Sequence, residues 1–279
     1  MAAPIILYHN LMDEPGATLT ASSTATGYDV NHVKDRLSFT YWKSVTYTNE
    51  WIKIDLGATS SVYANAIAIT GHNLYTTNAD YAVQYSTDDV TYSPAVVNPY
   101  PQEGHIFSDA PTLVTSVDWS AGSGSRYWKI RFDFGDSAIQ IGSICLGRKL
   151  ELPERMDQGF DPDALQLALM QSRSRGGTFV GNVAGHVKQR VKLKFGPAGL
   201  SRSSFHDATG TPSVQDFLRN YWAKGKPFWF KWGGEPTADT HYRHGYYCHP
   251  PADAKSTMPM ITSTRRGWGF EFDVHAEGF

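Results

Sequence analysis

The sequence has few cysteines, few charges and no long apolar segment. Two cysteines, Cys145 and Cys248, are present among 279 residues, which cannot build the multi-disulfide framework of a small secreted domain and favours a reducing folding compartment. Charged residues make up 19% and the formal net charge is −2, so a basic footprint for nucleic acid and a polybasic membrane anchor are both missing. No stretch approaches the ~18 consecutive apolar residues of a membrane span, so no membrane insertion is expected.

Targeting and catalytic motifs are missing as well. The first residues, 1–8, lack the basic region and the apolar length of a signal peptide. There is no phosphate loop, no dinucleotide fingerprint and no strand-to-helix serine elbow. A glycosidase would need two carboxylates about 5–9 Å apart in a cleft, and the acidic pairs, such as Asp88 with Asp89, fit turns instead. The sequence therefore predicts a protein that is not an enzyme and needs no cofactor.

Aromatic residues and glycines are abundant, which favours strands and turns. Aromatics make up 13% of the chain, with 25 glycines. Residues 51–57 and 126–134 alternate apolar and polar side chains, as half-buried strands do, and 141–147 form a third apolar segment. The core positions that this alternation predicts are Ile52, Ile54, Leu56, Trp128, Ile130, Phe132 and Phe134.

These segments occur in an order that resembles the discoidin family, the coagulation factor type C domains. Further marks are Ser22-Ser23, Thr40-Tyr41-Trp42 and the stretches 66–74 and 81–89. The resemblance covers residues 1–150. It implies a jelly-roll sandwich that binds sugars, lipids or proteins through loops at one end, without catalytic machinery.

The loops implied by this resemblance carry aromatic and polar side chains that could contact a sugar ring and its hydroxyls. The candidate ligand-binding residues are Tyr28, Phe39, Tyr41, His72, Asn73 and Tyr75. The structural alternative is that Tyr41 closes the core and that His72 and Asn73 form a turn.

The same resemblance implies a calcium site in some members. Asn31, Asp35 and Thr40 supply oxygen ligands of the kind calcium prefers. Calcium-binding members often place a glutamate just before the last strand, where this chain has Ser143. The sequence therefore favours a loop held by hydrogen bonds alone over a calcium site.

A second set of metal-ligand types lies near the C-terminus. His241, His244, Cys248 and His249 are closely spaced, and zinc would need four ligands in a tetrahedral cluster. Because the segment is loop-like and rich in tyrosine, turn or interface histidines are favoured over zinc.

Residues from about 164 onward follow a different pattern, after a polar connector over 148–163. A helix is expected over 213–224, since its apolar residues recur at helical spacing and Ser213 with Asp216 forms a capping pattern. The expected strands of this region are 187–195, 228–232, a short one at 246–247, and 268–274. Residues 165–170 fit a strand or a short helix, and the strand is favoured because Gly176-Gly177 follow a polar turn. A β sandwich or barrel crossed by one helix resembles the ring-forming domain of phage distal tail and tail-tip proteins.

The fold class predicted is therefore mainly β: a discoidin-like jelly-roll sandwich over 1–150 and a β sandwich or barrel with one helix over 151–279. The two resemblances imply a virion structural protein at the tail tip (baseplate) of a long-tailed phage, made in the host cytoplasm. Its partners would be itself in a ring, with a hexamer favoured over a trimer, the tail tube and hub proteins, and a host surface glycan. The alternative is a non-virion carbohydrate-binding protein, or the binding module of a bacterial glycan-processing system.

The ring hypothesis draws on an aromatic surplus in the second region, because aromatic side chains are enriched at the centres of protein interfaces. The candidate interface residues are Trp229, Trp232, Tyr242, Tyr246 and Tyr247.

Overall fold

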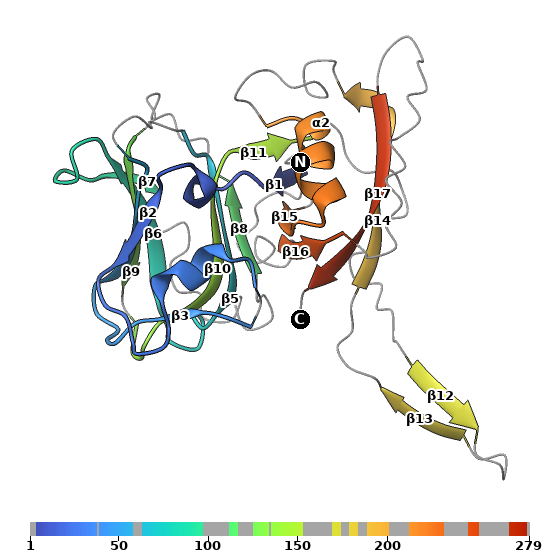
Figure 1. The fold of residues 1–279 in the computed structure, drawn as a ribbon, viewed down its shortest axis with the longest axis horizontal. Helices are drawn as coiled ribbons and strands as arrows, with labels where there is room; N and C mark the ends of the chain where they lie inside the picture. The colour runs from blue at the N-terminus through green and yellow to red at the C-terminus, as the bar shows by residue number, and fades with distance from the viewer. Residues whose placement is uncertain are drawn as a thin grey trace.

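The computed structural model is mainly β, with one short helical segment (Figure 1). The residues that it describes are 4–37, 39–57, 63–96, 112–116, 125–133, 135–152, 169–173, 179–183, 189–200, 212–231, 245–250 and 268–277. Among these residues no helix is long and apolar enough to cross a membrane.

The first region is a sandwich of two antiparallel sheets. The five-stranded sheet has the order β2 (Thr18–Ala21), β4 (Glu50–Asp55), β9 (Tyr127–Asp133), β6 (Asp80–Ser86) and β7 (Ser93–Val96). The four-stranded sheet has the order β3 (Trp42–Lys43), β10 (Gln140–Gly147), β5 (Ala66–His72) and β8 (Thr112–Ser116). Two 3₁₀ turns, η1 (Leu11–Asp13) and η2 (Val30–Lys34), add Leu11, Met12 and Val33 to the core between the sheets.

The core lies where the alternation predicts it. Ile52, Ile54 and Leu56 are at most 1% exposed, and Trp128, Ile130 and Phe132 at most 3%. Phe134 lies outside the described residues. Full burial of one such side chain stabilises the fold by about 1.5–3 kcal/mol, so this apolar face is the main source of stability in the sandwich.

A six-stranded sheet, called the second sheet below, joins a strand near the N-terminus to the strands of the second region. Its order is β11 (Lys149–Glu151), β1 (Ile5–Leu7), β15 (Phe228–Lys231), β16 (Gly245–His249), β17 (Trp268–Glu277) and β14 (Gln189–Leu200). Ile6 lies opposite both Leu150 and Phe230 in this ladder. Residues at both ends of the predicted first domain therefore hydrogen-bond into the sheet of the second, and the division near residue 150 stays a prediction about independent folding.

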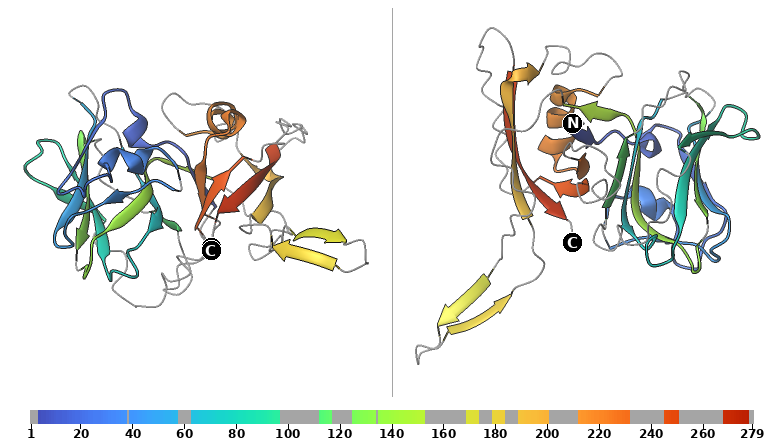
Figure 2. Two further views of the ribbon diagram at one scale, coloured as in Figure 1. Left: turned by 60° about the horizontal axis from the view of Figure 1, so that its bottom comes forward. Right: turned by 180° about the vertical axis from the view of Figure 1, so that it is seen from behind.

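The predicted helix over 213–224 is confirmed, but its turns are not uniform. It runs through α2 (Val214–Asp216), the π turn η3 (Phe217–Tyr221) and the 3₁₀ turn η4 (Trp222–Lys224). The Ser213 hydroxyl accepts the backbone N–H of Asp216 at 3.1 Å, which caps the first turn. Gly225 ends the segment in the left-handed conformation, with φ 68°. The segment packs over the second sheet (Figure 2).

The first sandwich and the second sheet share a buried apolar cluster; these two parts of the chain are called the two assemblies below. It contains Ile5, Leu7, Trp229 and Tyr247 from the second sheet, and Ala66, Ala68, Val114 and Cys145 from the outer face of β5, β8 and β10. The Trp229 indole N–H donates to the Thr70 hydroxyl at 2.7 Å. The four-stranded sheet is therefore buried on both faces.

Arg36 joins the assemblies through polar contacts. Its guanidinium donates to the carbonyl oxygens of Pro227 (3.3 Å) and Tyr8 (3.4 Å) and forms an ion pair with Asp13. Its own carbonyl accepts the hydroxyl of Tyr247 at 2.5 Å. These bonds satisfy a charged side chain that is 9% exposed, which would otherwise be costly to bury.

These contacts correct the prediction for the aromatic residues of the second region. Trp229 and Tyr247 are 0% exposed and Tyr246 is 6% exposed within one chain, so these three side chains pack inside the chain, and assembly into a ring stays a prediction. Trp232 and Tyr242 lie outside the described residues.

One hairpin stands apart from both assemblies. β12 (Leu169–Arg173) and β13 (Phe179–Val183) pair with each other as a two-stranded sheet and project away from the body (Figure 1). Of the strand expected at 165–170, its last residues, 169 and 170, begin β12, and 165–168 lie outside the described residues.

Candidate functional site

Four loops meet at one end of the first sandwich. They are residues 22–29 after β2, 44–49 between β3 and β4, 73–79 between β5 and β6, and 135–139 before β10. The bonds that join these loops to one another or to the adjacent strand ends are Val45 N–H to Ser23 Oγ (2.9 Å), Ala25 N–H to the Lys43 carbonyl (2.8 Å), Ile139 N–H to Ser44 Oγ (2.8 Å) and Asp136 N–H to the Thr77 carbonyl (2.9 Å). The loops therefore form one cross-linked platform.

Glu50 anchors this platform from below. Its carboxylate, on a residue 1% exposed, accepts the hydroxyls of Ser22, Ser23 and Thr46. Ser22 and Ser23 are among the marks of the resemblance to the discoidin family, whereas no role for Glu50 was predicted from the sequence. A carboxylate directly before an alternating strand was the available signal.

Tyr28 and Tyr41, two of the predicted ligand residues, lie together. Their rings stack with centroids 4.8 Å apart and an interplanar angle of 30°. The ammonium of Lys43 lies 5.8 Å from the centroid of the Tyr28 ring. A hydrogen bond with Tyr28 raises the pKa of the Tyr41 hydroxyl. The pair is half-buried and offers ring surface with two hydroxyls at its rim.

Large apolar side chains on the same loops point to solvent. Val45 is 60% exposed and Tyr47 47% exposed, both between β3 and β4. Leu37 (41%) and the predicted Phe39 (76%) are exposed on the segment before β3. Val45 and Tyr47 are two residues apart on one loop, and exposed apolar groups that gather on a surface are typical of interaction sites. Val45 and Tyr47 were not predicted, because sequence alone does not tell an exposed loop residue from a buried one.

Asn73 has its side chain committed to the fold. Its amide oxygen accepts the N–H of Gln140 at 2.7 Å, and its amide group donates to the Ala138 carbonyl at 2.9 Å. It therefore ties two loops together, as the structural alternative proposed. Tyr75 lies half-buried in the adjacent turn.

His72 ends β5 beneath the loops. Its Nδ1 accepts the N–H of Leu74 at 3.4 Å, and burial lowers the pKa of its imidazole to about 4. Its Nε2 is buried without a hydrogen-bond partner among the described residues. The ring is therefore neutral near pH 7 and has no path to a ligand hydroxyl through Nδ1.

The calcium ligands considered from the sequence do not fit the ion. The carboxylate of Asp35 already accepts the N–H of Leu37 (2.9 Å) and the hydroxyl of Thr40 (2.8 Å). The side-chain N–H of Asn31 donates to the carboxylate of Asp29 at 2.8 Å. Among the described residues, no three His, Cys, Asp or Glu side chains gather in a way that could hold a metal. Hydrogen bonds account for the shape of this loop.

The C-terminal ligand types are partly described. Cys248 is buried in β16 with its thiol toward the carbonyl of Tyr246 at 3.8 Å, and the ring of His249 packs against Tyr247 with centroids 4.8 Å apart. His241 and His244 lie outside the described residues.

Comparisons with known proteins show similarity in fold alone. No family model matches this chain, and no curated protein matches it. One similar solved structure is a family 32 carbohydrate-binding module, CpGH89CBM32-6, produced by Clostridium perfringens, with 17% identity, a TM-score of 0.39, and coverage of 50% of this chain and 98% of that chain.

Two further structures have similar values. A GH29 fucosidase of Ruminococcus gnavus in complex with fucose has 18% identity and a TM-score of 0.38, over 50% of this chain and 26% of that chain. A lectin-binding domain of lectinolysin complexed with Lewis b has 14% identity and a TM-score of 0.37, over 51% of this chain and 98% of that one. The chain thus spans about a quarter of the fucosidase. None of these three is a phage tail protein, and the tail role stays a prediction.

Proposed function

We propose that this chain is a non-catalytic glycan-binding protein that uses the loop end of its first sandwich. The observation that carries the proposal is the set of exposed and half-buried aromatic rings on a platform of cross-linked loops, with Tyr47 exposed and Tyr28 stacked on Tyr41. Sugar rings have apolar faces that pack on aromatic side chains, and a few polar groups then fix their orientation. Loops already held by hydrogen bonds lose little entropy when a ligand binds.

The proposed ligand is a neutral sugar bound weakly by each copy. The Lys43 ammonium lies 5.8 Å from the centroid of the Tyr28 ring, and the tyrosine hydroxyls supply neutral donors and acceptors. Because the contact is small and shallow, useful affinity would come from several copies or several sugar units, which raise the effective concentration.

The test compares variants at the two ends of the sandwich by glycan-array binding and isothermal titration. Tyr47→Ala and Tyr28→Ala should each weaken binding about tenfold, which is the loss of one stacking contact worth roughly 1.4 kcal/mol. Val90→Ala is the matched control, because Val90 is 82% exposed on the turn after β6, at the opposite end from the loop that precedes β6. Equal binding by all three variants, or no binding to any neutral glycan, would refute the proposal.

The virion role is a separate proposal. It is supported by the order of elements in the second region, in which one helical segment lies between β14 and the aromatic strand β15, as the resemblance to tail proteins implies. Co-purification of the tagged chain with tail particles would support it. Binding of glycan by the purified monomer, with no such association, would favour the non-virion alternative.

A further inference from the structure

The outer face of the five-stranded sheet holds cations at adjacent positions. Lys53 on β4 lies directly opposite Lys129 on β9, and Arg131 lies opposite Trp51 on the same pair of strands. Like charges that face each other across a ladder destabilise a sheet. Repulsion between Lys53 and Lys129 therefore destabilises this face of the sheet.

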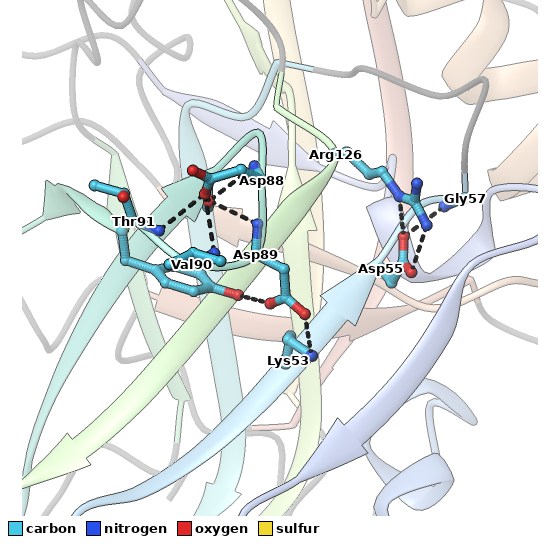
Figure 3. A network of polar contacts seen from close by, with 10 residues as sticks. Lys53, Asp55, Gly57, Asp88, Asp89, Val90, Thr91 and Arg126 are labelled. Carbon is cyan, nitrogen blue, oxygen red and sulfur yellow. Dashed lines mark hydrogen bonds and ion pairs between the residues drawn. The ribbon is translucent and has the colours of Figure 1, made fainter.

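Two of these cations have anionic partners. Lys53 donates to Asp89 at 2.7 Å, as Figure 3 shows, and Arg131 pairs with Asp133 at 2.7 Å. Lys129 differs: among the described residues it has no hydrogen-bond acceptor and no ion-pair partner, and its contacts are with aromatic rings.

Lys129 lies between two aromatic side chains. Its ammonium is 3.5 Å from the centroid of the Tyr92 ring and 5.4 Å from that of the Trp51 ring. Partial burial, followed by the charges of Lys53 and Arg131, lowers the pKa of this ammonium, while Asp89 opposes the shift. The ammonium is therefore partly buried against two aromatic rings, and the described part of the chain supplies it with no oxygen acceptor.

The turn beside Lys129 is held in place. Asp88 accepts the N–H groups of Val90 (2.9 Å) and Thr91 (2.8 Å), which lowers the pKa of its carboxyl to about 2. The next residue, Asp89, accepts the hydroxyl of Tyr92 as well as the Lys53 ammonium. Figure 3 shows Asp88 bonded within its own turn and Asp89 bonded to Lys53 of β4. The aromatic wall beside Lys129 is thus fixed without a ligand.

We propose that this face is a second binding site, for an anionic saccharide whose carboxylate or sulfate accepts hydrogen bonds from Lys129 while its ring packs on Trp51. An anionic ligand fits because its charge would relieve the opposition of the two lysines. A sugar fits because a half-exposed indole offers flat apolar surface beside the ammonium. A nucleic acid does not fit, because a phosphate backbone is bound by several cations, whereas Lys53 and Arg131 on this face are already paired with Asp89 and Asp133. The side chains of this site lie on the outer face of the sheet rather than on the loops, although the backbone of Trp51 bonds to Ser22 of the loop platform.

The experiment titrates the full chain with three probes: oligogalacturonate, its methyl ester and a sulfated galactan oligosaccharide that carries no carboxylate. The methyl ester removes the negative charge and adds only a methyl group to each carboxyl, and the third probe distinguishes a sulfate from a carboxylate ligand. At least one anionic probe should bind about 10- to 100-fold more tightly than the methyl ester, as expected for a charge-assisted hydrogen bond.

Variants locate the site. Lys129→Met should lose that preference, Lys129→Arg should retain it, and Trp51→Ala should weaken binding of the anionic probe. Lys224→Met, a lysine on the helical segment, is the matched control for removing one positive charge. Tyr47→Ala should leave anionic binding unchanged, so failure here and failure of the loop site are distinguishable. Equal affinity for the methyl ester, or full binding by a folded Lys129→Met chain, would overturn the proposal.

Discussion

Replacing Trp229 with alanine tests whether the two β assemblies unfold as one unit. The side chain is 0% exposed and lies in the shared cluster between β15 and the outer face of the four-stranded sheet. Truncating a buried tryptophan to alanine costs about 3–5 kcal/mol, because apolar burial is lost and a cavity remains. This is a large share of the 5–15 kcal/mol by which a typical domain is stable.

The hydrogen bond can be measured apart from the packing. Thr70→Val removes the acceptor of the Trp229 indole, which is 2.7 Å away, and leaves a buried N–H without that partner, at a cost of about 1–3 kcal/mol. Trp229→Phe removes the donor instead. The double variant should be less destabilised than the sum of the two, by roughly 1 kcal/mol.

The assay is urea unfolding followed by circular dichroism, combined with hydrogen exchange read on peptides from β5 and β16. We expect Trp229→Ala to lower protection in both strands together. Trp51→Ala, a half-exposed tryptophan on β4, is the control and should cost less than the buried residue. If β16 loses protection while β5 keeps all of it, the assemblies are energetically independent and the shared cluster contributes little.

Three further predictions concern pH, capping and a surface ion pair. The lowered pKa of His72, about 4 against an ordinary 6.5, means that the unfolded chain binds the proton first. The free energy of unfolding should therefore fall as pH drops from 6.5 to 4, by at most about 3 kcal/mol. His72→Gln should make the urea midpoint less dependent on pH over that range. Ser213→Ala should cost about 0.5–2 kcal/mol in urea unfolding, because it removes the cap on the Asp216 N–H. Asp55→Asn breaks a paired contact with Arg126 (2.7 and 2.9 Å) that is partly solvent-exposed, and should cost under about 1 kcal/mol, less at high salt.

The local periodicity of the sequence was sufficient to predict the central strands of the first sandwich. β4 alternates buried and half-buried residues, and so does β9, as their sequences predict. β15 departs from its expected alternation, because Phe228, Trp229 and Phe230 are all buried. One face meets the helical segment, where the rings of Phe217 and Phe228 are 4.8 Å apart, and the other meets Thr70 of the sandwich. Sequence spacing does not show that a second layer covers a strand.

The N-terminal strand was missed for a related reason. Residues 5–7 are a short apolar run, which was weighed against a signal peptide and had no visible partner. Their partners, β11 and β15, lie far along the chain. Likewise, Tyr28 and Tyr41 were each named as loop residues from the sequence, but their stacking and the opposed lysines on β4 and β9 become visible only when the fold and the register of the sheet are known.

The two outer faces of the first sandwich explain where binding can occur. β5 is buried from Ala66 to Thr70 without alternation, because the second sheet covers its outer side. β4 keeps its alternation, since its outer side carries Trp51 and Lys53 toward solvent. A continuous apolar run indicates a strand covered on both faces, whereas alternation indicates one open face. The covered face is therefore committed to holding the chain together, and the open face and the loop end are the surfaces left to bind a ligand.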